Sequence, residues 1–187
     1  YKKGNYTEAM RMFKTEAGRG DKDAQFALGR LYEEGRAVEA STALAENWYR
    51  KAALQGHPSA QFNLAVLLLN IQGRSAEGLE WMRKSADAGS GRAMLTLGSM
   101  AINGNGVERN PAEARKWFEK AAGSGESEAY DALGQMYEAG EGVEKSAAKA
   151  IEMYENASRL DFLKSMLRLG LVYLNGLGVA KDPVKAV

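Results

Sequence analysis

The sequence predicts an all-α fold, a right-handed superhelical solenoid of about five helix-turn-helix repeats. Two sequence phrases, each with the spacing of one helix, recur along the chain, and repetition of this period is typical of solenoid proteins. The second phrase keeps the same register as the first in every copy. The first phrase carries a leucine that returns after 36, 33, 36 and 36 residues, at Leu28, Leu64, Leu97, Leu133 and Leu169.

The first phrase predicts the first helix of each repeat. Ala24, Leu28 and Leu31 follow one another at the i, i+4, i+7 spacing of a single helix face. Glycine inside a helix costs about 1 kcal/mol relative to alanine. A recurring glycine at one place therefore predicts that the two helices of a pair approach closely there. That glycine stands directly after the leucine, at Gly29, Gly98, Gly134 and Gly170, with Ala65 in the remaining copy.

The second phrase predicts the second helix of each repeat. It consists of two adjacent large apolar residues followed by small ones, at 12–13, 48–49, 81–82, 117–118 and 153–154. Gly-x-Gly-Val stretches at 104–107, 140–143 and 176–179 predict left-handed residues that end the first helix. They follow helices and not strands, so we interpret them as helix stops and not as phosphate-binding loops. Pro111 and Pro183 predict the starts of second helices.

The copies depart from the common pattern in a few places. The second copy lacks the Gly-x-Gly-Val turn and is three residues shorter, so a tighter loop is expected there. Ala37 and Asp161 stand where a turn glycine belongs. The sequence begins and stops within second helices, which predicts one solenoid cut from a longer chain. The expected units are about 1–20 (partial), 21–56, 57–89, 90–125, 126–161 and 162–187 (partial).

The composition argues against several classes of function. Hydrophobic residues make up 45% and charged residues 26% of the 187 residues, with a net charge of +1. This balance predicts no attraction to nucleic acid or to an anionic membrane. No apolar run is long enough for membrane insertion. The chain has no cysteine, which excludes disulfides and thiolate metal sites. We expect no metal, no cofactor and no catalytic residue.

Two residue types could suggest chemistry but have a simpler interpretation. His57 is the only histidine, and in Gly56-His57-Pro58 it is expected to be a solvated turn residue without a second metal ligand. The three tryptophans could form a stacking platform. They share one repeat position among small core residues, which favours packing. They are Trp48, Trp81 and Trp117.

The full motif resembles a known family. A-x-x-x-L-G-x-x-Y-x-x-G-x-G-V, followed by a W-Y/F-x-K-A-A-x-x-G helix, is similar to the Sel-1-like repeats, relatives of the tetratricopeptide repeats. Residues 90–143 show it best, and the similarity covers essentially the whole chain. The resemblance implies a non-enzymatic adaptor in bacterial secretion, envelope assembly or host interaction, or in eukaryotic protein quality control. It leaves the compartment open, with a secreted or periplasmic location favoured if the protein is bacterial.

The resemblance also implies where a partner binds. Tetratricopeptide relatives use the concave face lined by the first helices, and the shared Leu-Gly pattern carries those positions onto this chain. The predicted partner-binding residues are Phe26, Arg30, Phe62, Asn63, Val66, Leu69, Asn70, Ser99, Ile102, Asn103, Gln135, Glu138, Leu171, Leu174 and Asn175. The recurring asparagines either hold the backbone of an extended peptide or cap the first helix. The apolar members fall off the core stripe and, if exposed, predict a partner site.

Three functions remain open from the sequence. The favoured one is a scaffold that binds a peptide or partner protein on the concave face. An alternative is an assembly module in which open solenoid ends stack or exchange helices between copies. A helical enzyme or small-ligand domain has least support, because no convergent polar cluster stands out.

Overall fold

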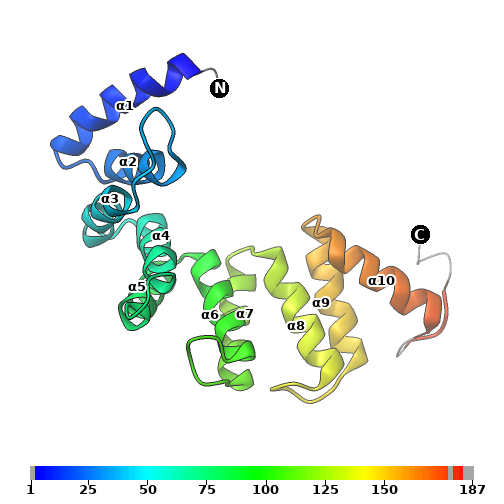
Figure 1. Ribbon diagram of the computed structural model, residues 1–187. Coiled ribbons are helices and arrows are strands. Elements are labelled where there is room, and N and C mark those ends of the chain that lie inside the picture. Colours follow the sequence, from blue (N-terminus) through cyan, green and yellow to red (C-terminus); the bar gives the residue numbers. More distant parts are fainter. Residues whose placement is uncertain (1–2, 177–178, 183–187) are drawn as a thin grey trace. The chain divides into compact units, whose positions relative to one another are not determined.

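The computed structural model describes residues 3–176 and 179–182, and it contains ten α-helices and no strand within them (Figure 1). The predicted all-α class is therefore confirmed. The chain divides into two compact units, Tyr1–Ser90 and Gly91–Val187. In each unit every helix packs against the next one along the chain, and the helices alternate between the first and second type of the repeat.

The first unit contains five of the helices. Helices α2 and α4 are first helices, and α1, α3 and α5 are second helices. Their bounds are α1 Lys3–Gly18, α2 Lys22–Glu34, α3 Thr42–Leu54, α4 Pro58–Leu69 and α5 Ser75–Asp87.

The second unit continues the alternation, with α6, α8 and α10 as first helices and α7 and α9 as second helices (Figure 1). Their bounds are α6 Gly91–Asn103, α7 Pro111–Gly123, α8 Ser127–Ala139, α9 Ala147–Arg159 and α10 Leu163–Asn175.

The helix ends follow the predicted turn chemistry. Gly140 and Gly176 end α8 and α10 in the left-handed conformation, and each N–H bonds the carbonyl four residues back. Ala37 (φ 66°) and Asp161 (φ 59°) adopt the same region without being glycine, so the turn geometry persists where the sequence departs from it. Pro111 opens α7 as predicted, whereas Pro183 lies outside the described residues.

The recurring mid-helix glycine marks the predicted close approach. A Cβ atom on Gly98 would lie 2.5 Å from the ring of Phe118, and one on Gly134 would lie 2.3 Å from the ring of Tyr154. Gly29 has the same relation to Tyr49, at 2.4 Å. In these three repeats the second member of the large apolar pair therefore packs its ring against the first helix of its own repeat. These rings are almost fully buried, and they hold each helix pair together.

In the shortened second copy, a different glycine allows the two helices of the pair to approach closely. A Cβ atom on Gly78 in α5 would lie 2.9 Å from the backbone nitrogen of Leu69 and 3.1 Å from the carbonyl of Ala65. Gly78 thus allows the backbones of α4 and α5 to come together where the loop between them is short. This glycine does not recur in the other copies, and the repeat pattern gave no reason to single it out.

His57 corrects a prediction. Its side chain is 13% exposed, so it is not a solvated turn residue. The Nδ1 atom accepts a hydrogen bond from the backbone N–H of Ala60 and caps α4. Its ring lies 4.6 Å from that of Phe26, and Nε2 is 3.3 Å from Asp23. The residue joins the end of one repeat to the start of the next, which is a structural role.

Candidate functional site

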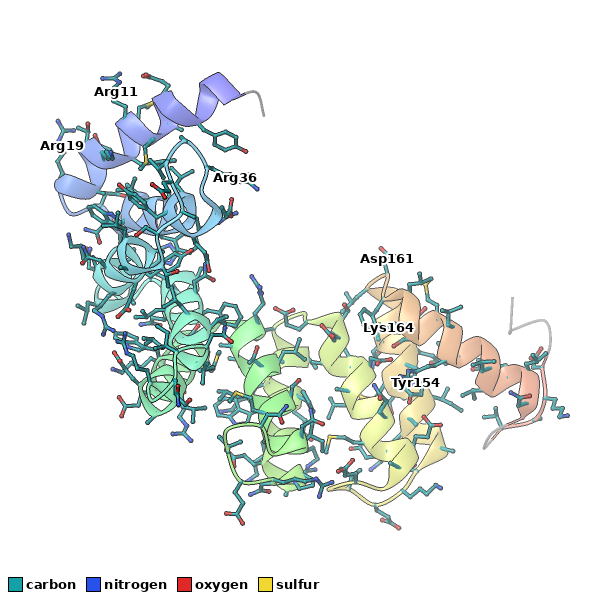
Figure 2. All side chains as sticks on the ribbon, viewed as in Figure 1. Arg11, Arg19, Arg36, Tyr154, Asp161 and Lys164 are labelled. Carbon is teal, nitrogen blue, oxygen red and sulfur yellow. The ribbon has the colours of Figure 1, made fainter. Side chains whose placement is uncertain are left out.

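The exposed side of the first helices is called the first-helix face. The rings that pack over the glycines contact particular residues on this face. Tyr154 stands on α9 (Figure 2). In the 127–162 repeat, its hydroxyl donates to Glu138 at 2.6 Å, and the guanidinium of Arg168 lies 5.9 Å from its ring. In the first unit, the Tyr49 hydroxyl donates to Glu33 at 2.5 Å and accepts from the Asn63 amide at 3.1 Å.

Burial dominates the ionisation of both tyrosines. Desolvation, followed by the adjacent carboxylate, raises the pKa of Tyr49 and of Tyr154 well above the ordinary value of 10.0. Both hydroxyls therefore stay protonated and remain hydrogen-bond donors to Glu33 and Glu138 at physiological pH. Each bond ties the second helix of a repeat to the first.

The intervening copies use apolar residues at the same places. Phe118 and Met82 replace the tyrosines, and Ile102 and Leu69 replace the glutamates, five residues after the repeat leucine. Ile102 is half-buried and packs on the cluster that contains Phe118. A ring without a hydroxyl is thus matched by an aliphatic side chain across the pair, because a carboxylate there would have no donor.

A hollow of about 790 Å³ lies on the first-helix face of the second unit. Side chains from α6, α8 and the start of α10 surround it, and Phe118 reaches it from α7. Its lining mixes apolar side chains with amides and charged groups. The lining residues are Leu95, Ser99, Ile102, Asn103, Phe118, Glu128, Asp131, Ala132, Gln135, Met136, Glu138, Ala139, Glu141, Phe162, Lys164 and Arg168.

A buried carboxylate fixes one wall of this hollow. Asp131 in α8 accepts from the Ser165 hydroxyl at 2.6 Å and from the Gln135 amide at 2.7 Å. Arg168 lies 3.3 Å from the same carboxylate, whose side chain is 5% exposed. The other copies carry an apolar residue at the first of these positions and an alanine at the second, so Asp131 and Ser165 depart from the pattern together. The network fixes α8 against α10 and orients Arg168 along the wall.

Five of the predicted partner-binding residues line the hollow. They come from α6 and α8, the first helices of two successive repeats. They are Ser99, Ile102, Asn103, Gln135 and Glu138.

The predicted residues of α10 do not line the hollow. Leu171 and Leu174 are 56% and 52% exposed on another part of that helix, and Asn175 is also exposed.

The predicted residues of the first unit are largely engaged within the unit itself. Phe26 packs between Tyr49 and His57, and Asn63 bonds Tyr49. Arg30 pairs with Glu34 at 2.7 Å on the exposed surface of α2. The three apolar members, Phe62, Val66 and Leu69, are half-buried in α4.

The asparagine positions support the helix-end interpretation, one of the two that the sequence left open. The Asn70 amide donates to the Val66 carbonyl at 2.9 Å, and the Asn103 amide donates to the Ser99 carbonyl at 2.8 Å. Each therefore satisfies the end of its own first helix. A side-chain amide has two N–H groups and an acceptor oxygen, so capacity for a further partner remains on both.

The sequence reasoning left several lining residues out. Lys164 comes from the repeat after the one it faces, and Glu128 comes from the first turn of α8. Offsets within a single helix cannot show that a following helix closes the side of a hollow. The joint departure of Asp131 and Ser165 from the repeat consensus was the available signal.

The tryptophans have a packing role of their own. Lys51, Lys84 and Lys120 each lie three residues after a tryptophan and place the ammonium 4.2, 4.3 and 4.5 Å from its ring centre. These are cation–π contacts. Arg50, beside them on α3, instead pairs with Glu46 at 2.9 Å.

Within residues 3–176 and 179–182, no group of three or more His, Asp or Glu side chains is placed to hold a metal ion. No helix in this part of the chain is both long and apolar enough to span a bilayer.

The repeated helix pairs and the hollow on the first-helix face define a helical-repeat protein of the kind that acts as a protein-interaction module. The Sel1 repeat family model matches residues 22–57, 58–90, 91–126, 127–162 and 163–187. The chain belongs to the Sel1 repeat family, whose members are generally non-enzymatic scaffolds with protein partners.

Known proteins of the family are similar over different extents. A crystal structure of a Sel1 repeat protein from Oxalobacter formigenes is 31% identical with a TM-score of 0.90, covering 98% of this chain and 76% of that one. A protective antigen of uropathogenic Escherichia coli with an SLR fold is 32% identical with a TM-score of 0.88, covering 97% of this chain and 39% of the antigen.

Curated relatives are much longer than the matched region. The chitin synthase regulator SKT5 of Saccharomyces cerevisiae is 32% identical over 108 residues, which are 54% of this chain and 16% of the regulator. An uncharacterized protein of Neisseria meningitidis is 29% identical over 106 residues, 57% of this chain and 22% of that protein. The chain thus spans less than a quarter of the length of these two relatives.

Proposed function

We propose that the protein is a scaffold that binds an extended segment of a partner protein on the first-helix face, in the hollow formed by α6, α8 and α10. The observation that carries the proposal is that five of the residues predicted from the family resemblance line this one hollow. A regulator of chitin synthase among the relatives supports a role in partner binding.

The lining suits a peptide better than a small metabolite. Asn103 and Gln135 stand on neighbouring first helices with spare amide capacity, which matches the alternating donors and acceptors of an extended backbone. Leu95, Ile102 and Met136 supply apolar surface for the side chain of such a segment. The hollow is therefore equipped for both the backbone and one anchoring side chain.

The charges favour a basic anchoring side chain. Arg168 pairs with Asp131, and Arg109 pairs with Glu141. Among the described residues no ion pair neutralises Glu128 or Glu138, whereas Lys164 contributes one positive charge. A lysine or arginine can lay its aliphatic stem along the apolar lining residues and bring its charge to these carboxylates. Binding is accordingly expected to weaken as the salt concentration rises.

Site-specific photo-cross-linking tests the location. A photoreactive amino acid is placed at Asn103 or Gln135 in the hollow, or at the exposed Glu119 of α7 as the matched control. We expect a partner protein to be captured from both hollow positions and not from position 119. Capture from position 119 alone would place the partner on the second helices and contradict the proposal.

A blocking variant tests the contribution of the hollow to affinity. Ser99→Tyr is expected to fill the hollow and weaken binding of the captured partner at least tenfold. Glu152→Tyr on the exposed face of α9 is expected to leave binding unchanged. Equal affinity of the Ser99→Tyr variant and the wild type, with both folded by circular dichroism, would rule out the hollow as the binding site.

A further inference from the structure

Helix α10 contributes two basic side chains to the hollow. Lys164 stands in the first turn of α10 (Figure 2), and Arg168 follows four residues later, so the two are neighbours on one face of the helix. Both line the hollow and therefore lie on the side of α10 that faces the preceding repeats. Among the described residues, Lys164 forms no hydrogen bond and no ion pair. Its charge is available to a bound molecule.

Arg168 is held by one edge of its guanidinium. Its Nε atom lies 3.3 Å from the Asp131 carboxylate, although no hydrogen bond forms there. The two carboxylate oxygens of Asp131 accept instead from the Ser165 hydroxyl and the Gln135 amide. The guanidinium also lies 5.9 Å from the centre of the Tyr154 ring. The group is thus positioned by its surroundings, and its terminal N–H groups donate to no acceptor among the described residues.

These terminal N–H groups suit a carboxylate. The two parallel N–H donors of a guanidinium match the two oxygens of a carboxylate, and such paired bonds are among the stronger hydrogen bonds in proteins. The Arg168 side chain is 40% exposed, so a second carboxylate can reach it from the hollow. Asp131 cannot take that place, because its side chain is 5% exposed and both its oxygens are engaged. Lys164 adds a second positive charge beside Arg168.

Glu138 carries the opposite charge at the other end of the hollow. It stands in the last turn of α8 and accepts the Tyr154 hydroxyl at 2.6 Å, and no described residue donates to its second oxygen. Arg168 lies beside Asp131, and Glu138 follows Asp131 by seven residues, which is about 10 Å along the axis of α8. An extended chain covers this distance in about three residues.

We propose that the segment bound in the hollow carries a basic and an acidic residue about three positions apart. The basic side chain pairs with Glu138, and the carboxylate of an aspartate or glutamate side chain binds Arg168 and Lys164. This inference rests on the proposed function, because it names the class of segment that the hollow accepts. A wholly basic segment would bring like charge to Arg168 and Lys164, and a wholly acidic one would bring it to Glu138. The charges of the hollow thus favour a segment of mixed charge.

Glu128 gives the proposal a distinctive consequence. It occupies in α8 the repeat position that Lys164 occupies in α10, and both line the hollow. A carboxylate at this end competes with the acidic residue of the segment for the same cations. Glu128→Gln is therefore expected to strengthen binding of a mixed-charge segment by about twofold, whereas Glu138→Gln is expected to weaken it at least fivefold. These opposite effects would not arise if the hollow attracted only basic side chains.

Selection from a library of short random peptides tests the proposal. Peptides that bind the full 187-residue chain are selected, and those that also bind the Ser99→Tyr chain are removed. We expect the remaining peptides to share a basic and an acidic residue about three positions apart. Changing that acidic residue to its amide, Glu to Gln or Asp to Asn, should weaken binding at least fivefold.

Variants of the chain show which side chains receive the carboxylate. In Lys164→Glu, the acidic peptide and its amide form should bind with nearly equal affinity. Arg168→Lys retains a charge beside Asp131 and loses the paired donors, so it should also reduce the preference for the acidic peptide. Lys116→Glu, at an exposed position of α7 outside the hollow, is the matched control and should keep the full preference. Circular dichroism checks that each variant is folded.

The outcomes separate this inference from the proposed function. If every selected peptide also binds the Ser99→Tyr chain, the hollow is not the binding site and both fall. If the remaining peptides lack an acidic residue, or bind equally well in the amide form, the mixed-charge inference is overturned and the proposed function stands. Dependence on the free C-terminal carboxylate of the peptide in place of a side chain, measured by amidating that end, would overturn it as well.

Discussion

The repeats at 91–126 and 127–162 share one architecture but hold their helix pairs together with different chemistry. In the first, Phe118 lies on Gly98 and the face position carries Ile102, which packs on the apolar cluster. In the second, Tyr154 lies on Gly134 and its hydroxyl bonds Glu138. The comparison teaches that the residue displayed on the first-helix face is coupled to a ring on the second helix. Both Ile102 and Glu138 then line the same hollow.

The largest expected effect comes from breaking this coupling. Ile102→Glu places a carboxylate against a cluster whose ring has no hydroxyl, and we expect it to lower the free energy of unfolding by about 2 to 3 kcal/mol. Adding Phe118→Tyr should restore about 1 kcal/mol or more, since the hydroxyl supplies the missing donor. Urea denaturation of the two single variants and the double variant measures the coupling energy. Strict additivity of the two substitutions would refute the pairing rule.

A second substitution tests the glycine that both repeats share. Gly134→Ala puts a methyl group into the ring of Tyr154, and we expect a net loss of about 1 to 2 kcal/mol after the gain in helix propensity. Gly123→Ala in α7 is the control, because no atom lies within 4 Å of the place that its new methyl group would take, and it should be neutral or slightly stabilising. Thermal unfolding of both variants measures the difference, and a stabilised Gly134→Ala chain would show that the ring contact is not tight.

A third, smaller effect concerns the hydroxyl by itself. Tyr154→Phe removes the donor to Glu138, which is exposed and can bond water instead, so a loss of about 1 kcal/mol is expected. Tyr49→Phe should cost more, because it also leaves the half-buried Asn63 amide without its acceptor. Chemical denaturation ranks the two variants, and the reverse order would show that the Asn63 contact adds no stability.

The smallest effect is a difference in alkaline sensitivity between the two kinds of repeat. Burial raises the pKa of Tyr154 above its ordinary value of 10.0, so the folded chain keeps the proton after the unfolded chain has lost it. This stabilisation is complete below pH 10 and declines as the pH rises through the folded-state pKa. Stability measured between pH 9 and 11 should fall less steeply in Tyr154→Phe than in the wild type. Identical slopes would mean that Tyr154 titrates as an exposed tyrosine does.

Part of the candidate site could be predicted from the sequence, but its environment could not. The register of Gly98 and Gly134 predicted a close approach, and the offsets from them gave five residues that meet in one hollow. The same offsets presented Ile102 as a possible surface residue, although it packs on the Phe118 cluster. A periodic pattern shows which face a residue occupies, and it does not show what side chain lies opposite on another helix.

The sequence by itself determined the all-α class, the helix pairs, the turns that end them and the Sel1 family, because each depends on local spacing that repetition reinforces. Tertiary structure decided the rest. It showed that Ala37 and Asp161 keep the left-handed turn, that His57 caps a helix, and that Lys164 completes the hollow from the next repeat. The hollow depends on contacts between residues more than 30 positions apart, such as that of Ser165 with Asp131, which one helical period cannot encode.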